Sequence, residues 1–115
     1  MSIIQQLTDA YIEAVYFTED TPDNDNPPDA RLSKRDKMHA YVSCRNFYDA
    51  CRELDIDMSN TAQMGHDLWI TRNRHGVGFW DRPEVYGETN AKILTAISLA
   101  MGEHNVEFVS GDEDA

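Results

Sequence analysis

The stretch 65–82, GHDLWITRNRHGVGFWDR, constrains the fold of this chain more than any other. Its residues follow a period of two, so Leu68 and Ile70 would point to one face of an extended chain and Asp67, Trp69 and Thr71 to the other. Turn-forming residues at 73–76 divide the stretch in two, and Pro83, which cannot continue the hydrogen bonding of a strand, follows its end. The pattern predicts a β-hairpin.

Three other segments have apolar residues at helical spacing, which predicts helices over 2–17, 34–54 and 88–102. The side chains expected to face the core are Ile3, Ile4, Leu7, Tyr11, Ala14 and Val15 in the first helix, Met38, Tyr41, Cys44, Tyr48 and Cys51 with Val42 and Phe47 beside them in the second, and Ala91, Leu94, Ile97 and Met101 with Ile93 and Ala100 beside them in the third.

Terminal residues support the ends of these helices. Ser2 stands three positions before Gln5, the spacing of a capping box, in which each residue bonds the backbone N–H of the other. Ser33 stands in the same relation to Asp36 and is the expected N-cap of the second helix. Gly102 follows the third helix and is a typical helix stop.

The remaining segments complete the prediction of an α+β fold. Residues 18–31 hold three prolines and many Asp and Asn residues, which predicts an acidic loop, and residues 105–109, NVEFV, predict a short strand. The element order is then α-α-β-β-α-β, with the last strand beside either strand of the hairpin. We expect a single domain over 1–115, with three helices packed on a small three-stranded antiparallel sheet and an acidic tail at 110–115.

The charge is strongly negative and unevenly spread. The net charge is −11, and residues 1–30 contain seven acidic and no basic side chains, whereas residues 31–54 contain six basic and three acidic ones. Such a chain repels the phosphates of duplex DNA, so we expect no binding to duplex DNA and an attraction to basic surfaces of other proteins. The sequence shows no apolar run that could span a membrane and no signal peptide, so we expect a cytoplasmic protein without a membrane partner.

The two cysteines, Cys44 and Cys51, share one face of the second predicted helix. Their spacing corresponds to a rise of roughly 10 Å along a helix, which is too far for a disulfide. They also lack the close spacing of zinc ligands, so we interpret them as core thiols. A metal site would otherwise need dispersed histidines to converge, and we predict neither a metal nor a cofactor. Those histidines are His66, His75 and His104.

A catalytic function is not predicted. His66, Asp67 and His75 are the candidates for acid–base chemistry, with Asp81 as an orienting carboxylate. Adjacent residues of a strand point to opposite faces, which would separate His66 from Asp67, and His75 falls in the expected turn. The sequence has no nucleophile elbow, phosphate-binding loop or zinc-protease motif. We therefore expect that the protein is not an enzyme.

The tip of the expected hairpin combines aromatic and basic residues. Trp69 and Trp80 would share one face and could stack single-stranded bases. The same pair would serve equally to pack against a helix. Direct binding of single-stranded nucleic acid and a role in the core are therefore both open. The basic side chains at the tip are Arg72, Arg74, His75 and Arg82.

The motif GHD-x-W-x-TRN-x-HG-x-GFWD resembles that of a family of small proteins encoded by bacteriophages and related mobile elements. In the common form of that family, Phe stands in place of Leu68, Gly in place of Arg74 and Ala in place of Val77. The resemblance covers the hairpin, and the helices match in pattern. It implies a phage origin and a fold, without a settled biochemical activity. Glycine at position 74 also implies a positive φ there.

The acidity and the resemblance together lead to a hypothesis of function. We expect an accessory phage protein in the host cell that binds and inhibits a host protein, in a defence or nucleic-acid-processing complex, by acidic mimicry of nucleic acid. The alternatives are a single-stranded nucleic-acid-binding protein and a structural interaction module, and homo-oligomerisation stays open. The residues expected to contact the partner are Glu19, Asp20, Asp23, Asp25 and Asp29 in the loop, Arg72, Arg74, His75 and Arg82 at the hairpin, and Glu103, Glu107, Asp112, Glu113 and Asp114 near the C-terminus.

Overall fold

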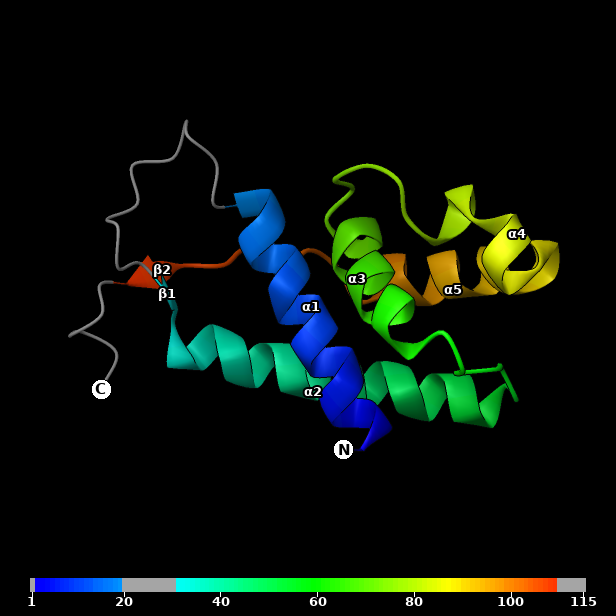
Figure 1. Ribbon diagram of the computed structural model, residues 1–115, viewed down its shortest axis with the longest axis horizontal. Coiled ribbons are helices and arrows are strands. Elements are labelled where there is room, and N and C mark those ends of the chain that lie inside the picture. Colours follow the sequence, from blue (N-terminus) through cyan, green and yellow to red (C-terminus); the bar gives the residue numbers. More distant parts are fainter. Residues whose placement is uncertain (1, 20–30, 110–115) are drawn as a thin grey trace.

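The computed structural model describes residues 2–19 and 31–109, which are dominated by helices (Figure 1). The elements are, in chain order, α1 (Ile3–Glu19), β1 (Arg31–Leu32), α2 (Lys34–Glu53), α3 (Thr61–Arg72), the 3-10 helix η1 (Phe79–Asp81), α4 (Pro83–Tyr86), α5 (Glu88–Ala100) and β2 (Phe108–Val109). α1 packs on both α3 and α2, and the two short strands lie at the end of the molecule where α2 begins. Across the described ranges, no helix is long and apolar enough to cross a membrane.

The predicted α+β fold with a three-stranded sheet is wrong. In the part of the chain that the structure describes, the only sheet has two strands, β1 and β2, which pair antiparallel. Arg31 lies opposite Val109, and Leu32 lies opposite Phe108. The predicted last strand at 105–109 is therefore present in part. Its partner is a segment at the end of the expected loop, and not a strand of the hairpin.

The predicted hairpin at 65–82 is also wrong. Its first half continues α3 to Arg72, and its second half forms a turn, η1 and the connection to α4. Residues 67–72 are all buried, because α1, α5 and η1 pack around α3. A helix buried on every side shows no apolar stripe, so a chance alternation of polar and apolar residues imitated a strand.

The three predicted amphipathic helices are confirmed, with small shifts of their ends. α1 extends to Glu19 instead of residue 17, α2 ends at Glu53, and α5 ends at Ala100. Their apolar stripes continue over several turns, so the sequence predicts that these helices exist. It predicts their ends less accurately.

The predicted N-cap bonds of Ser2 and Ser33 are present, but Gln5 Nε2 donates to Asp9 Oδ1 at 2.8 Å, so only one half of the predicted capping box is found among the described residues. Gln5 N–H donates to Ser2 Oγ at 3.0 Å, and Asp36 N–H donates to Ser33 Oγ at 3.2 Å. Gly102, after α5, has a φ of 76°, the left-handed backbone that ends many helices.

The buried face of α2 differs from the predicted stripe. Met38 is 62% exposed, and Tyr41 and Val42 also face solvent. The segment after α5 covers the beginning of α2 and donates hydrogen bonds to the carboxylate of Asp36, so small and polar residues face inward there instead. The buried residues of α2 are Asp36, Ala40, Ser43, Cys44, Phe47 and Cys51.

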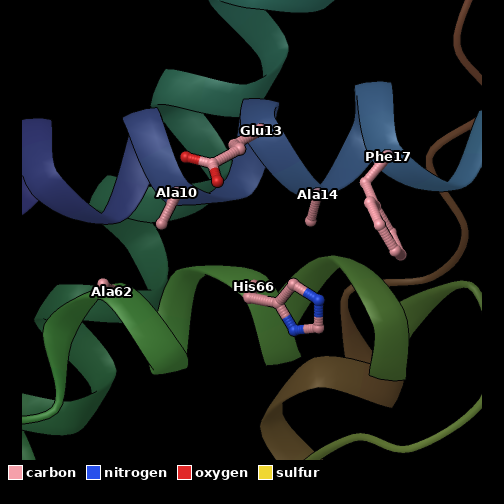
Figure 2. A pocket seen from close by; sticks show the side chains of 6 residues that line it. All are labelled: Ala10, Glu13, Ala14, Phe17, Ala62 and His66. Carbon is pink, nitrogen blue, oxygen red and sulfur yellow. The ribbon is translucent and has the colours of Figure 1, made fainter.

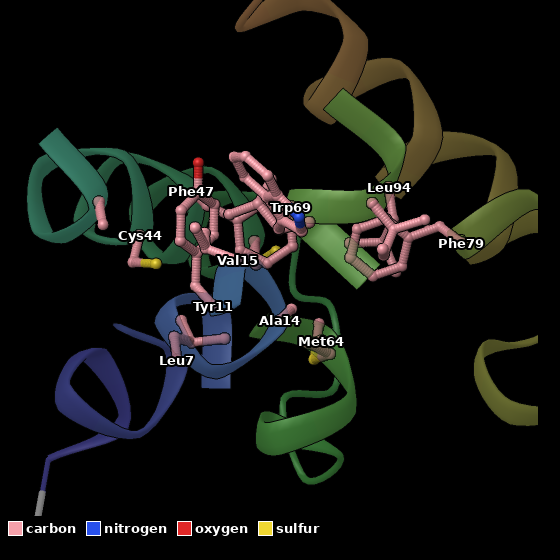
Figure 3. Packing of buried hydrophobic residues seen from close by; sticks show 14 of the residues in the cluster. Leu7, Tyr11, Ala14, Val15, Cys44, Phe47, Met64, Trp69, Phe79 and Leu94 are labelled. Carbon is pink, nitrogen blue, oxygen red and sulfur yellow. The ribbon is translucent and has the colours of Figure 1, made fainter. Parts of the chain in front are cut away.

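The core lies where α1, α2 and α3 meet, with aromatic side chains at its centre (Figure 3). Tyr11 meets Trp69 edge to face, with ring centroids 5.5 Å apart. Phe79 and Ile70 are buried, and Phe79 stacks on Phe47 with ring centroids 5.7 Å apart. η1 is therefore fixed to the core by an aromatic side chain, although it is a single turn long.

Candidate partner-binding site

Predicted partner-contact residues from three separate segments meet at one end of the molecule. Glu19 ends α1, His75 lies in the loop after α3, and Glu103 follows α5, yet all three line one cavity of about 180 Å³. His75 Nε2 lies 3.3 Å from Glu19 Oε1, which connects the loop to α1. We call the surface around Glu19, Glu103 and Glu107 the acidic end.

The two acidic segments attach at the same place. Segment 20–30 lies between Glu19 and Arg31, and segment 110–115 follows Val109. Arg31 and Val109 are direct partners in the two-stranded sheet, so both segments join the molecule at the acidic end. The predicted acids within them lie outside the described residues; they are Asp20, Asp23, Asp25, Asp29, Asp112, Glu113 and Asp114.

Buried polar side chains hold the segment 101–107 that presents Glu103 and Glu107. Arg72 of α3 donates to the carbonyls of residues 101 and 102, at 3.2 and 2.8 Å. Asn73 Oδ1 accepts from the N–H of residue 104 at 2.8 Å, and Asp36 Oδ2 accepts from the N–H of residue 107 at 2.7 Å. The backbone that carries these acids is therefore fixed from α2 and from the end of α3.

His104, within this segment, completes a buried chain of hydrogen bonds. Its Nδ1 lies 2.8 Å from the Tyr11 hydroxyl, and its Nε2 lies 3.1 Å from Asp36 Oδ1. Arg72 Nη1 donates to the Tyr11 hydroxyl at 3.2 Å, so this hydroxyl accepts from the arginine and donates its own proton to Nδ1. Nε2 then carries the ring proton and donates it to Asp36, which assigns the tautomer of the neutral ring.

Burial favours the neutral form of His104. Burial lowers the pKa of His104 more than the hydrogen bond to Asp36 raises it, and the positive charge of Arg72 lowers it further. Burial acts to raise the pKa of Asp36, but the hydrogen bonds from the N–H of Glu107, from His104 and from Ser33 together lower it. A neutral histidine and an ionised carboxylate are the states that this network requires.

The potential metal ligands found in the described residues are Asp36, His39 and His104, whose ligand atoms all lie within 4.8 Å of one another. The sequence signal for this group is the one-turn spacing of Asp36 and His39, which the sequence analysis missed. Asp36 Oδ1 accepts from His104 Nε2 and occupies the position that a metal on this nitrogen would take. The rings of His39 and His104 stack at 3.8 Å, whereas ligands of one ion point toward a common centre in their ring planes. The geometry is that of hydrogen bonding and stacking, and the expectation of no metal stays a prediction.

The basic rim predicted at the hairpin tip is largely dispersed. The expected exposure of Arg72 is wrong, because this side chain is 3% exposed. Arg74 faces solvent, and its φ of 57° confirms the positive φ expected there. Arg82 turns toward Asp67, with Nε 3.0 Å from Oδ2. Arg74 and His75 are the predicted basic residues that remain exposed near the acidic end.

A second buried carboxylate, that of Asp67, lies on α3. It accepts from Gln63 Nε2 at 3.0 Å and from the Tyr86 hydroxyl at 2.8 Å, besides its ion pair with Arg82. His66 Nδ1 lies 3.2 Å from Asp67 Oδ1, so the expectation that these neighbours point apart is wrong. Successive residues of a helix are turned by about 100°, not to opposite faces as in a strand. Burial, together with the hydrogen bond to Asp67, raises the pKa of Tyr86.

The two tryptophans do not form one platform. Trp69 is 1% exposed and donates Nε1–H to Thr18 Oγ1 at 2.8 Å. Trp80 is 59% exposed and lies 6.0 Å from Lys92 Nζ. The shared stacking face that the hairpin implied for single-stranded nucleic acid is therefore wrong, and the core role applies to Trp69.

The interpretation of Cys44 and Cys51 as core thiols is confirmed, because both are buried and neither forms a disulfide. Burial raises the pKa of each thiol to about 12. The thiolate, which is the form that reacts and binds metals, is therefore scarce near neutral pH.

No protein-family model, curated protein or solved structure matches this chain. The resemblance of the motif at 65–82 to the phage family stays a prediction, and function is inferred from the residues themselves.

Proposed function

We propose that this chain is a phage accessory protein that binds a host protein through the acidic end and thereby inhibits it. Two observations carry this proposal: Glu19 and Glu103 line one cavity, and segments 20–30 and 110–115 attach beside each other where Arg31 pairs with Val109. An acidic surface attracts basic surfaces, and many basic grooves serve to bind nucleic acid. The expected target is therefore a defence or nucleic-acid-processing complex of the host.

The fixed backbone of 101–107 supports the proposal. Glu103 and Glu107 are exposed on this segment, while buried Arg72 and Asp36 hold its carbonyl and N–H groups. A backbone that is ordered before binding loses less conformational entropy when the partner docks. The carboxylates are then presented at set positions, as phosphates are along a nucleic acid.

The charge of the whole chain would act mainly on the rate of association. Complementary charges speed the encounter of two proteins, and salt screens them over a Debye length of about 8 Å at physiological ionic strength. The net charge of −11 contributes at long range, and the acidic end contributes where the partner docks.

The test compares the parent with three neutralised variants as baits in a lysate of the host bacterium. Proteins retained by the parent are identified, and their binding is then measured at low and at physiological salt. One variant replaces the acids of segments 20–30 and 110–115 by their amides. The second carries Glu19→Gln, Glu103→Gln and Glu107→Gln, and the third is a matched control at exposed sites elsewhere, with Asp49→Asn, Glu53→Gln and Glu84→Gln.

We expect the first two variants to bind about tenfold more weakly at low salt, with a smaller loss at physiological salt, and the control to bind like the parent. Duplex DNA should compete with the protein for its target, because both would occupy the same basic groove. Equal binding by all four proteins would contradict attachment through the acidic end. Unchanged activity of the bound target would contradict inhibition.

A further inference from the structure

A groove runs between α1 and α3, close to the acidic end. Figure 2 shows Ala10, Ala14 and Phe17 of α1 directed toward α3, with Glu13 lying across α1 and the ring of His66 lying over α3. The cavity measures about 330 Å³ and is lined by Ala10, Glu13, Ala14, Phe17, Ala62 and His66.

The groove is apolar and opens to solvent. Half of its lining residues are alanines, and Phe17 at its end is 80% exposed. α1 and α3 pack closely beside the groove because residue 65 is glycine. A Cβ at this position would overlap the carbonyl oxygen of Leu7. An exposed aromatic ring at the edge of an apolar groove is typical of a surface that contacts another molecule.

The two polar side chains of the groove are both hydrogen-bond acceptors. Glu13 offers a carboxylate. His66 Nδ1 lies 3.2 Å from a carboxylate oxygen of Asp67, which can only accept, so the ring proton of neutral His66 is on Nδ1.

These features restrict the occupant. A ligand that complements the groove must donate hydrogen bonds and carry an apolar group. A second copy of this chain fits poorly, because it also has a net charge of −11 and would bring its Glu13 near that of the first copy. Segment 20–30 has no apolar side chain larger than proline with which to cover Phe17. A basic partner with a large apolar side chain satisfies each condition.

We propose that this groove binds a basic amphipathic helix of the partner protein. The lining residues of α1, from Ala10 to Phe17, span about 10 Å, or two helical turns, which suits anchors spaced i, i+3 or i+4, and i+7. A large apolar side chain of the partner helix packs over Ala62 and against Phe17, which are both exposed, and a Lys or Arg one turn away pairs with Glu13. The inference rests on the proposed function only in that the partner is a protein with a basic surface.

The probe is a display library of helical peptides with randomised apolar and charged positions, selected against the full chain. We expect the enriched peptides to be basic and to share one aromatic or branched apolar residue within a turn of Lys or Arg. Methyl NMR of the alanine-labelled protein then maps the site. The signals of Ala10, Ala14 and Ala62 should shift saturably with peptide concentration.

Variants assign the contacts. Phe17→Ser removes the exposed ring and Glu13→Lys reverses the charge, and each should weaken peptide binding by about tenfold or more. Ala62→Trp, at an exposed position, should block the groove. The matched controls are Trp80→Ser and Glu84→Lys, also exposed, and both should bind the peptide like the parent. If Ala62→Trp fails to fold, Phe17→Ser still decides the outcome, because that ring packs on little of its own chain.

Three results would overturn the inference: enrichment of acidic or purely polar peptides, chemical shifts confined to residues outside the groove, or no enrichment at all. Self-association of the parent that Phe17→Ser abolishes would assign the groove to a second copy instead. The neutralised variants of the acidic end separate the two proposals. If these variants no longer bind the host protein while the groove variants still bind it, the proposed function stands and this inference fails. If the groove variants lose the host protein and the neutralised variants keep it, the groove is a binding site and the acidic end is not.

Discussion

Arg72 and Arg82 both bind to buried groups, but they are stabilised in different ways. Arg72 is 3% exposed and donates to two backbone carbonyls and to the hydroxyls of Tyr11 and Ser43. Among the described residues it contacts no carboxylate. Arg82 keeps 26% of its side chain exposed and pairs with the carboxylate of Asp67. One arginine is a buried cation with neutral acceptors, and the other is a partly exposed cation paired with a buried carboxylate.

The difference shows what each arginine holds together. Arg72 joins α1, α2 and α3 to the segment 101–107, so the backbone of the acidic end depends on it. Arg82 and Asp67 hold only the chain around η1 and α4 against α3. A buried guanidinium requires enough well-placed acceptors, and neutral oxygens suffice when several of them converge.

The largest effect is expected for Arg72→Met. It should lower the free energy of unfolding by about 3–5 kcal/mol, because the two buried hydroxyls lose a donor at about 1–3 kcal/mol each and the two partly buried carbonyls lose one at a smaller cost. Urea denaturation measures this, with Arg74→Met at the exposed neighbouring site as the control, expected to change stability by about 0.5 kcal/mol or less. Equal costs for the two variants would contradict the central role of Arg72.

A smaller effect is expected for Asp67→Asn, with a loss of about 2–4 kcal/mol, because Arg82 and Tyr86 would face an amide without charge. Arg82→Met should cost at least as much as Asp67→Asn, since it leaves the fully buried carboxylate of Asp67 without its cation, whereas Asp67→Asn leaves a guanidinium that is partly solvated. The double variant Asp67→Leu with Arg82→Met should regain part of the loss, as replacements of whole ion pairs often do. A double variant that is less stable than either single variant would show that the cost of the single changes does not come from leaving one charge of the ion pair without its partner.

The buried hydrogen bonds that connect Arg72 through Tyr11 to His104 should also make the free energy of unfolding depend on pH. Burial lowers the pKa of His104 in the folded protein, so between that value and the unfolded value of about 6.5 the unfolded chain binds more protons. The free energy of unfolding therefore keeps the full contribution of neutral His104 above about pH 6.5. Below that pH it decreases by up to about 1.4 kcal/mol per pH unit because of His104. Burial and Arg72 also lower the pKa of His39, but solvent screening reduces its contribution.

Urea unfolding between pH 7.5 and pH 5.5 measures this dependence. His104→Gln keeps one donor and one acceptor and should flatten the curve. A slope that persists in this variant would assign the dependence to other groups.

The smallest effect is expected at the surface of the acidic end. Glu103→Gln with Glu107→Gln should change the free energy of unfolding by about 0.5 kcal/mol or less, because exposed charges contribute little to stability. Thermal unfolding followed by circular dichroism measures it. A loss as large as that of Arg72→Met would mean that these acids are structural and would remove them from the proposed binding surface.

The contrast between α2 and α3 shows how far the sequence could be interpreted. α2 has one solvent-exposed face, so its helical period and its Ser33 cap were visible, although the assignment of Met38, Tyr41 and Val42 to the core was wrong. α3 is surrounded by other elements, and the alternation of its residues 67–72 was mistaken for a strand. For the candidate site, sequence identified Glu19, His75 and Glu103 individually, but nothing local indicated that they line one cavity.

The sequence by itself determined three amphipathic helices, two of their N-caps, the buried state of the cysteines and the acidity of the chain. These properties depend on neighbours within a few positions or on composition. Only the tertiary structure decided that α3 is a helix, that β1 pairs with β2, and that Arg72 lies inside while Phe17 lies outside. Those outcomes depend on which distant segments supply covering surface and hydrogen-bond acceptors. Arg72 can be buried because Tyr11, Ser43 and two carbonyls after α5 converge on it, and no local pattern encodes that convergence.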